Sequence, residues 1–376
     1  MSPRRWALGG RLDRYVAGNY LAALLVAAGV LVGLYMIVNL AANVDDWLEP
    51  DGQHTPWQQL WRVAGYCLLR APFLFLSLAP FVTLIAGLFT MARLKKSGEM
   101  VAALSIGISA RRLMAPVFFV AGLMAVGCFL GREQAVARLG FFSDTLGIEL
   151  DRRQPSVRLE RLRLKDRQGE MIRLDAYVPG PDPSGDGALF EGLDAVRLIG
   201  ERWIHYGAAR GTYRGVSGYG FWELEGGWRE DVGSDQRTRT ELEALSGGLE
   251  FHPYDVWSAW KGRSNPMDLS YAQATLLSSR DPDNVQYRTL RQYLLTFPLA
   301  NLVLLLCGLP FLMSYERGRD GIGPVAGFLL CVFYFCADFV CLNLGMQGHI
   351  SPLLAAWLPP TFFGSLGVVL FCGGRS

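Results

Sequence analysis

The sequence lacks the motifs that mark the common nucleotide-hydrolysing, zinc-dependent and serine-dependent enzymes. It contains no G-x-x-x-x-G-K-[ST] phosphate-binding loop, no H-E-x-x-H zinc motif and no G-x-S-x-G nucleophile motif. Its four histidines are scattered without the spacing of metal ligands. We therefore predict no catalytic residue, no metal ion and no cofactor. The formal net charge of +2 gives no reason to expect a nucleic-acid partner.

Charged residues are missing from six long stretches of the chain. A helix needs about 20 apolar residues to cross the hydrocarbon core of a bilayer, which is about 30 Å thick. Six stretches of roughly that length carry no Asp, Glu, Lys or Arg except Asp338: residues 21–40, 71–92, 115–130, 294–313, 322–339 and 353–371. We predict six transmembrane helices, of which the third is short and is followed directly by Gly131 and Arg132.

Cysteine is missing from the polar middle of the chain, residues 132–291, which argues against a disulfide framework there. Polar and apolar residues alternate along this part, for example in residues 157–164, 171–178 and 220–225, and clusters of Gly, Pro and Asp separate the runs. This pattern predicts an all-β sandwich or jelly roll, followed by a connector with a short helix over residues 271–279. Such a module can bind a partner at a free strand edge or serve as a spacer.

The positions of the cations predict how the chain is oriented in the membrane. Lys and Arg gather before the first apolar stretch and in the loops after the second and fourth: Arg4, Arg5, Arg11, Arg14, Arg93, Lys95, Lys96, Arg111, Arg112, Arg317 and Arg319. Because cytoplasmic loops are enriched in Lys and Arg, both termini are predicted to be cytoplasmic. The organisation is then helices 1–3 in residues 1–131, an extracytoplasmic β domain in residues 132–291 and helices 4–6 in residues 292–376.

The cytoplasmic loop between helices 2 and 3 contains the best candidate site. Ser97 can cap a short helix over about residues 97–106, and Glu99 stands in its first turn, where a carboxylate suits the helix dipole. Gly107 is placed to end the helix. Glu99 could pair with an arginine of another protein, or the segment could be an interfacial helix with a solvated carboxylate.

Several polar residues lie within or beside the apolar stretches. A carboxylate near the middle of a bilayer costs about 2.5–3.5 kcal/mol on insertion scales, so Asp338 either faces a cavity or partner helix or lies nearer the membrane surface. Arg62 and Arg70 could meet lipid phosphates or extend to the interface. Asn301 carries the same ambiguity as Asp338. The candidates for a lipid cavity or gate are Asn39, Asn43, Arg62, Arg70, Asp338 and Asn343.

The order of several short motifs resembles the LptF/LptG permease family, over essentially the whole chain. These motifs are Leu12-Asp13-Arg14-Tyr15, Pro80, Glu99, Gly107-Ile108-Ser109, Pro116 and Gly308-Leu309-Pro310-Phe311. The first of them is slightly closer to the LptG pattern.

The resemblance implies an α-helical protein of the bacterial inner membrane, with six transmembrane helices and a periplasmic jelly-roll-like domain between helices 3 and 4. It implies one of two paired, paralogous permeases of an ABC transporter for outer-membrane biogenesis. Such a pair extracts lipopolysaccharide or a related glycolipid and passes it to a periplasmic LptC/LptA-like bridge, driven by a cytoplasmic ATPase dimer. The residues that match the ATPase-coupling segment are Ser97, Glu99, Gly107 and Ser109.

The sequence departs from the family near the outer end of helix 1, where members often carry a Lys or Arg. This chain has Asn39, Asn43, Asp45 and Asp46 there. Either the paired permease supplies the cations, or the lipid is less phosphorylated, or the cargo is a different lipid. A different class of function is a membrane-anchored periplasmic scaffold or ligand-binding sensor without transport, which predicts no stable ATPase partner. A membrane-anchored enzyme would need an acid–base cluster that the β module lacks.

Overall fold

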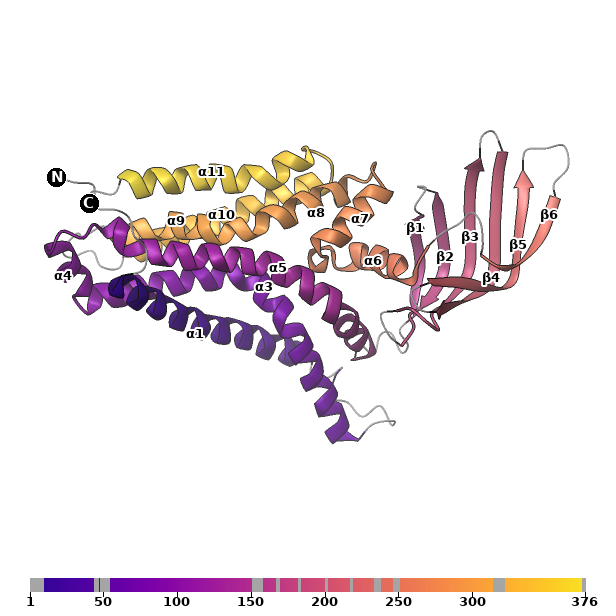
Figure 1. Cartoon of the computed structure of the whole chain (residues 1–376), viewed down its shortest axis with the longest axis horizontal. Helices are drawn as coiled ribbons and strands as arrows, with labels where there is room; N and C mark the ends of the chain where they lie inside the picture. Colours follow the sequence, from indigo (N-terminus) through magenta and orange to yellow (C-terminus); the bar gives the residue numbers. More distant parts are fainter. Residues whose placement is uncertain are drawn as a thin grey trace. The chain divides into compact units, whose positions relative to one another are not determined.

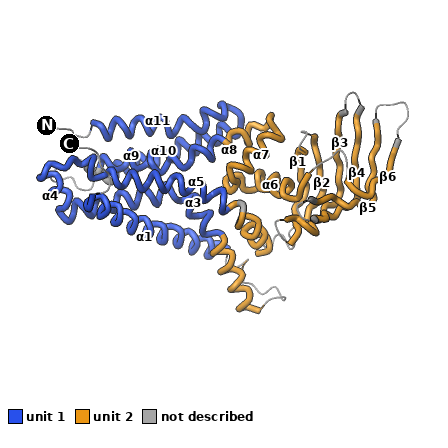
Figure 2. The backbone as a smooth tube through the Cα atoms, in the orientation of Figure 1, with its two compact units in different colours: residues 1–43, 70–135, 292–376 blue, residues 44–69, 136–291 orange. Residues whose placement is uncertain are grey.

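The computed structural model describes residues 10–43, 47, 55–150, 158–166, 170–181, 184–199, 202–216, 219–232, 238–245, 251–313 and 322–373. The chain divides into two compact units (Figure 2): unit 1 contains residues 1–43, 70–135 and 292–376, and unit 2 contains residues 44–69 and 136–291. Six of the charged residues named above lie outside the described residues: Arg4, Arg5, Asp45, Asp46, Arg317 and Arg319.

Six helices in the described part of the chain have the length and apolar composition needed to cross a membrane. They confirm the six predicted transmembrane helices. Their bounds are α1 (Arg11–Ala42), α3 (Pro56–Lys96), α5 (Ala110–Leu150), α8 (Val285–Thr296) continuing through a 3-10 turn into α9 (Ala300–Met313), α10 (Ile322–Met346) and α11 (Pro352–Gly373). A short helix, α4 (Glu99–Ser105), follows α3 and precedes α5 in the chain (Figure 1).

The third membrane helix differs from the sequence-based expectation in length. Helix α5 does not stop near Gly131 but continues to Leu150. Charged residues end the apolar stretch at Arg132, yet residues such as Glu133, Gln134 and Ala135 favour a helix. The hydropathy pattern therefore indicates how much of the helix suits a bilayer, and the helix itself ends 20 residues beyond Leu130.

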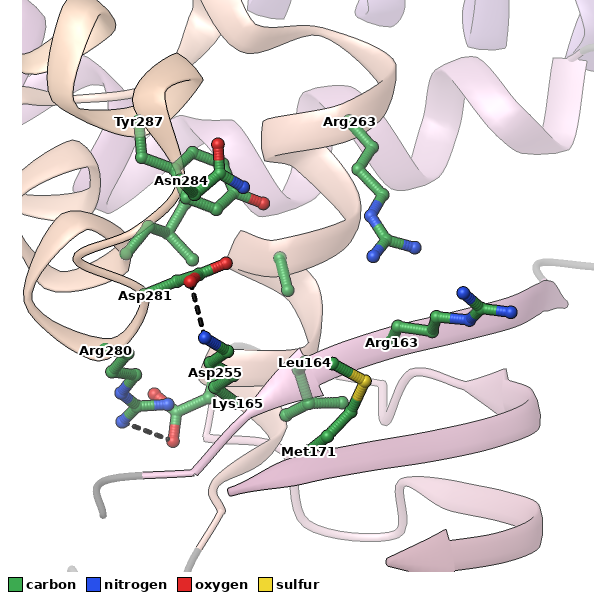
Figure 3. Close-up of a pocket in the computed structure, with 12 residues that line it drawn as sticks. Arg163, Leu164, Lys165, Met171, Asp255, Arg263, Arg280, Asp281, Asn284 and Tyr287 are labelled. Atoms are coloured by element: carbon green, nitrogen blue, oxygen red, sulfur yellow. Dashed lines mark hydrogen bonds and ion pairs between the residues drawn. The ribbon is translucent and has the colours of Figure 1, made fainter. Parts of the chain in front are cut away.

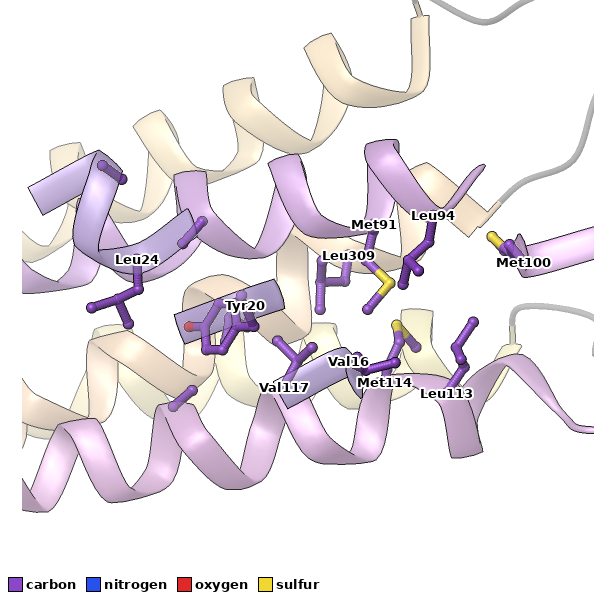
Figure 4. Packing of buried hydrophobic residues seen from close by; sticks show 14 of the residues in the cluster. Val16, Tyr20, Leu24, Met91, Leu94, Met100, Leu113, Met114, Val117 and Leu309 are labelled. Carbon is purple, nitrogen blue, oxygen red and sulfur yellow. The ribbon is translucent and has the colours of Figure 1, made fainter. Parts of the chain in front are cut away.

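The core of unit 1 joins α1, α3, α4, α5 and α9. Buried apolar side chains from these five helices form one cluster (Figure 4): Val16, Tyr20, Leu24, Ala27, Val82, Ala86, Met91, Leu94, Met100, Leu113, Met114, Val117, Ala121, Leu305 and Leu309. A second cluster joins α3 and α9 with α10 and α11. Met100 is the contribution of α4 to the first cluster, so the short helix is anchored to the membrane helices by apolar packing.

Unit 2 contains a six-stranded antiparallel sheet in which strands pair in chain order (Figure 1). The strands are β1 (Leu159–Lys165), β2 (Met171–Val178), β3 (Leu189–Ile199), β4 (Arg202–Val216), β5 (Tyr219–Val232) and β6 (Thr238–Ala244). An antiparallel β module in the predicted place is confirmed. Its described strands form one up-and-down sheet, whereas a jelly roll requires two sheets with Greek-key connections. Short connections between successive strands favour this simpler order.

Three residues with left-handed backbone lie in one row across the sheet. They are Arg161 on β1, Gly192 on β3 and Gly226 on β5, with φ angles of 54°, 64° and 64°. The flanking pairs place Asp175 between Arg161 and Gly192, and Ala209 between the two glycines. Because left-handed residues within strands kink them locally, this row bends strands at a common level.

Helices complete unit 2 after the last strand. Helix α6 (Pro253–Ser264) begins with a His252–Asp255 capping box and packs against β1. Helix α7 (Tyr271–Arg280) is capped by the Ser270 side chain, which confirms the helix predicted over residues 271–279. The ammonium of Lys261 on α6 lies 2.5 Å from a carboxylate oxygen of Asp144 on α5, and both side chains are buried. This pair ties α6 to the end of α5 within unit 2.

Candidate functional site

Helix α4 begins one residue later than its predicted cap. Its N-cap residue is Gly98, which has φ +76° and offers no side-chain cap. The Ser97 hydroxyl instead donates to the Leu94 carbonyl at 3.3 Å, so the prediction that Ser97 caps this helix is wrong. A left-handed residue is needed to separate α3 from α4, and only glycine adopts that conformation without steric cost. Ser97 belongs to the end of α3.

The end of α4 follows the prediction. Gly107 has φ +84°, its N–H donates to the Leu104 carbonyl at 3.0 Å, and the Ile108 N–H donates to the Ala103 carbonyl at 3.1 Å. These two bonds form a Schellman motif, which satisfies carbonyls that the helix would leave unpaired. The next helix starts at once, because the Ser109 hydroxyl accepts from the Arg112 N–H at 3.4 Å. Gly107 and Ser109 thus fix the two ends of a rigid corner.

Glu99 lies in the first turn of α4 and is exposed. The Tyr15 hydroxyl on α1 donates a hydrogen bond to Glu99 Oε1 at 3.1 Å. Tyr15 belongs to the motif Leu12-Asp13-Arg14-Tyr15, and the sequence alone does not predict this contact. Because Glu99 is exposed, an arginine of a partner could still bind the carboxylate.

A second contact joins the same segment of α1 to α5. The Arg112 guanidinium lies 2.7 Å from Asp13 Oδ2, and the same oxygen accepts from the Gly10 N–H at 3.1 Å. Asp13 is buried, with 7% of its surface exposed. The motif Leu12-Asp13-Arg14-Tyr15 therefore contacts both sides of the corner that holds α4.

The outer face of α4 and its end is apolar. Val101, Leu104 and Ile106 expose 49%, 38% and 76% of their surfaces. They lie opposite Met100 and Ala103, which are buried. An exposed apolar face beside an exposed carboxylate is the chemistry of a docking surface for another protein.

The carboxyl group of Asp338 on α10 has a hydrogen-bond partner within the chain. Its Oδ2 accepts a hydrogen bond from the Tyr293 hydroxyl at 3.0 Å, and both residues are buried. Tyr293 also packs beside Phe297, over which the Arg132 guanidinium lies at 5.6 Å. A hydroxyl donor lowers the free-energy cost of a carboxyl group in an apolar environment. Asp338 therefore joins α10 to α8. The sequence alone did not identify Tyr293 as its hydrogen-bond donor.

A further polar network lies deep in unit 1. The Thr83 hydroxyl on α3 donates to Asn301 Oδ1 on α9 at 2.9 Å, and Asn301 Nδ2 donates to the Pro298 carbonyl at 2.8 Å. The Tyr20 hydroxyl on α1 donates to the Thr83 carbonyl at 3.3 Å. This network connects three helices and resolves the ambiguity of Asn301 in favour of packing between helices.

The remaining predicted residues contact their own surroundings. Asn43 Nδ2 donates to the carbonyl and the side-chain oxygen of Asn39 at 2.8 and 3.0 Å, so the two asparagines end α1 together. Arg62 pairs with Glu149 at 2.8 Å, and Arg70 lies 5.7 Å from the ring of Phe73. Asn343 Nδ2 donates to the Phe339 carbonyl of its own helix at 2.8 Å. Six residues were candidates for a lipid cavity or gate. Among the contacts of the described residues, only Asn39 and Asn43 of these six contact each other.

Helices α1 and α10 present wide apolar faces that unit 1 does not cover. On α1 the side chains of Leu25, Val26 and Ile37 are each exposed by about two thirds, at 66–67%. On α10 Phe333 and Phe339 are exposed by 65% and 67%. Wide apolar faces of this kind favour contact with lipid or with another membrane helix over contact with water.

The comparison with protein families gives one result. A family model described as "Lipopolysaccharide export system permease LptF/LptG" matches residues 14–372, nearly the whole chain. The comparison with curated proteins gives no match. The family model spans both the LptF and the LptG branches.

Proposed function

The chain belongs to the LptF/LptG family of lipopolysaccharide export permeases, and we propose that α4 is the surface through which a separate cytoplasmic ATPase dimer drives it. The family assignment and the six apolar helices make the chain a multi-pass inner-membrane subunit of a lipopolysaccharide transporter. Because the chain has no phosphate-binding loop of its own, ATP hydrolysis in such a transporter would come from a partner.

The construction of α4 is the observation that carries this proposal. The helix presents Glu99 and an apolar face outward, while Met100 packs into the core of the membrane helices. A seven-residue helix between two left-handed glycines would move as one body. Force applied by a partner would therefore reach α3 and α5 through rigid corners rather than through a loose loop.

The proposed orientation follows the cations at the ends of the helices. Arg93, Lys95 and Lys96 end α3, and Arg111 and Arg112 begin α5. Placing this end in the cytoplasm satisfies the positive-inside rule and puts α4 on the side of the ATPase. The sheet and its connector, residues 132–291, would then be periplasmic and would meet a bridge protein of the LptC/LptA kind.

The exposed faces of α1 and α10 are the proposed contacts with the paired permease and with the lipid. The pair of asparagines at the end of α1 would be neutral hydrogen-bonding groups at the headgroup level. In this arrangement, the cations that bind lipid phosphates come from the paired permease.

The test is to purify the tagged chain gently from its own membranes and to identify the co-purifying proteins and lipids by mass spectrometry. We expect a P-loop ATPase, a second six-helix permease and bound glycolipid. The variants Glu99→Ala and Glu99→Lys should remain folded, with lipid release uncoupled from ATP hydrolysis. Glu225→Lys, which changes another exposed carboxylate, on β5, should behave as wild type.

Two results would contradict the proposal. Recovery of the chain alone, or with extracytoplasmic proteins only, would favour a scaffold or sensor. Unchanged lipid release by both Glu99 variants would remove the coupling role of Glu99 even if the ATPase is present.

A further inference from the structure

Unit 2 contains a pocket of about 190 Å³ between the sheet and the connector helices (Figure 3). Strands β1 and β2 form one side of it, and α6, α7 and the first turn of α8 form the other. A single water needs about 10–15 Å³ of such volume, so the pocket has room for a group of several heavy atoms. None of the residues that line it has a part in the proposed coupling function.

Cations outnumber carboxylates around this pocket. Two ion pairs account for both carboxylates: Arg280 lies 2.9 Å from Asp255, and Lys165 lies 2.6 Å from Asp281. Two further arginines, Arg163 on β1 and Arg263 on α6, also line the pocket. The described residues offer no ion pair to either arginine, and both side chains are exposed. The pocket therefore has an excess of two positive charges.

Two of the arginines lie together, and the Arg263 side chain also donates a hydrogen bond to the Tyr287 hydroxyl. Figure 3 shows the guanidinium groups of Arg163 and Arg263 on the same side of the pocket, away from the two ion pairs. Arg280 is 8% exposed, and its Nε has no hydrogen-bond partner in the described structure. A buried N–H without an acceptor destabilises the folded state, so an acceptor from outside the chain would relieve it.

We propose that this pocket binds a phosphomonoester group. A phosphomonoester carries nearly two negative charges at neutral pH, which matches the excess of two positive charges. Guanidinium groups bind phosphate oxygens in paired hydrogen bonds. The first turn of α8 contributes Tyr287 to the pocket, and the start of a helix favours an anion.

The phosphomonoester could belong to a lipid headgroup or to a small soluble molecule. Helix α8 opens the candidate membrane span Val285–Phe311, so the pocket residue Tyr287 lies near one end of that span. This location suits a headgroup as well as a free phosphate. The proposal does not depend on ATPase coupling, because it requires only the side chains of unit 2.

The experiment uses the full-length chain in a neutral detergent and inorganic phosphate as the probe, with calorimetry at low ionic strength. We expect saturable binding at one site, and at least a tenfold loss of affinity in Arg163→Gln and in Arg263→Gln. Asp281→Asn should tighten binding, because it releases Lys165 for the anion. The control Arg214→Gln removes another exposed arginine, on β4 and outside the pocket, and should leave the affinity unchanged.

A second titration identifies the source of the group. The same chain is placed in nanodiscs of phosphatidylcholine with or without phosphatidic acid, whose headgroup is a phosphomonoester. Loss of phosphate binding in the presence of phosphatidic acid assigns the pocket to lipid headgroups, and unchanged binding assigns it to soluble phosphate. Absence of phosphate binding in detergent, or equal affinity in all four variants with unchanged thermal unfolding, would overturn the proposal.

Discussion

The Tyr15 hydroxyl donates to Glu99 Oε1 at 3.1 Å, which joins two residues 84 positions apart in the sequence. Tyr15 lies in the first turns of α1, which is the least buried of the six apolar spans in the described part of the chain. A displacement of α4 would reach α1 directly through this bond, without passing through α3. If α1 is a gate for lipid, Tyr15 and Glu99 form a direct connection between the gate and the proposed ATPase surface.

We expect Tyr15→Phe to weaken the coupling of ATP hydrolysis to lipid release without unfolding the chain. Loss of one hydrogen bond to a charged group at an exposed site is worth about 1 kcal/mol, so the rate of lipid release should fall by roughly fivefold or less. ATPase activity in the assembled complex should change less than lipid release. The measurement is lipid release per ATP hydrolysed in proteoliposomes.

Tyr35→Phe is the matched control, because Tyr35 is an equally exposed tyrosine on the same helix, at 44% against 46%. It should release lipid at the wild-type rate. Equal rates for both variants would show that the Tyr15 hydroxyl carries no coupling.

The pair of Asp13 and Arg112 should stabilise the folded chain. The side chain of Asp13 is 9% exposed and that of Arg112 is 27% exposed, so the pair is partly shielded from water. Arg112→Met would leave the carboxylate of Asp13 without its cation, at an expected loss of about 1–3 kcal/mol in the free energy of unfolding. Denaturant unfolding of the purified chain measures it, and a loss below 0.3 kcal/mol would contradict the prediction.

The sequence predicted the membrane helices well because hydropathy is a property of local composition. The strand Met171–Val178 was predicted with the same bounds, since its alternation survives in the fold. Helix α6 was not predicted from the sequence, although His252 and Pro253 are residues that often begin a helix. Its residues include Trp257, Trp260 and Lys261, which are buried or partly buried on several sides, so no simple amphipathic pattern remains.

The contacts of the candidate site were less predictable than its position. Gly107 was placed correctly, because a glycine after a short helix has one common structural role. The capping role given to Ser97 failed because Gly98, the next residue, adopts the left-handed backbone that serine does not favour. The partners Tyr15, Thr83 and Tyr293 lie on other helices, and a single sequence carries no signal for which helices meet.

The interaction of Thr83 with Asn301 should be measurable as a coupling energy. Thr83→Val and Asn301→Leu each remove one side of the hydrogen bond, and the double variant removes both. Hydrogen bonds between membrane helices contribute about 0.6 kcal/mol on average and up to about 1.7, so we expect a coupling energy in that range from a double-mutant cycle.

Thr90→Val provides the control for this cycle. Thr90 is another buried threonine of α3, but its hydroxyl donates to the Ala86 carbonyl of the same helix at 2.7 Å. It should show no coupling to Asn301→Leu. Equal coupling for Thr83 and Thr90 would mean that the cycle reports general repacking.

Gly192 should be intolerant of a side chain. It has φ +64°, and a Cβ there would overlap the Asp175 side chain on the neighbouring strand. A non-glycine residue in this region of φ and ψ costs about 1–3 kcal/mol, and a branched side chain adds the steric overlap. We therefore expect Gly192→Val to lose at least 1 kcal/mol in the free energy of unfolding. The same substitution at Gly18 of α1, which has open space around it and ordinary helical backbone, should lose less than 1 kcal/mol.

Lys261 and Asp144 should give the largest single effect on the stability of unit 2. Their side chains are 1% and 8% exposed, and removing one partner of a buried ion pair costs about 3–5 kcal/mol because the other charge stays buried. We expect Lys261→Met to lose that much and the double variant Lys261→Met/Asp144→Leu to recover most of it. Arg62→Met, which breaks the more exposed pair with Glu149, should lose less than about 1 kcal/mol. A double variant as unstable as Lys261→Met would show that Asp144 stabilises unit 2 through contacts other than its ion pair.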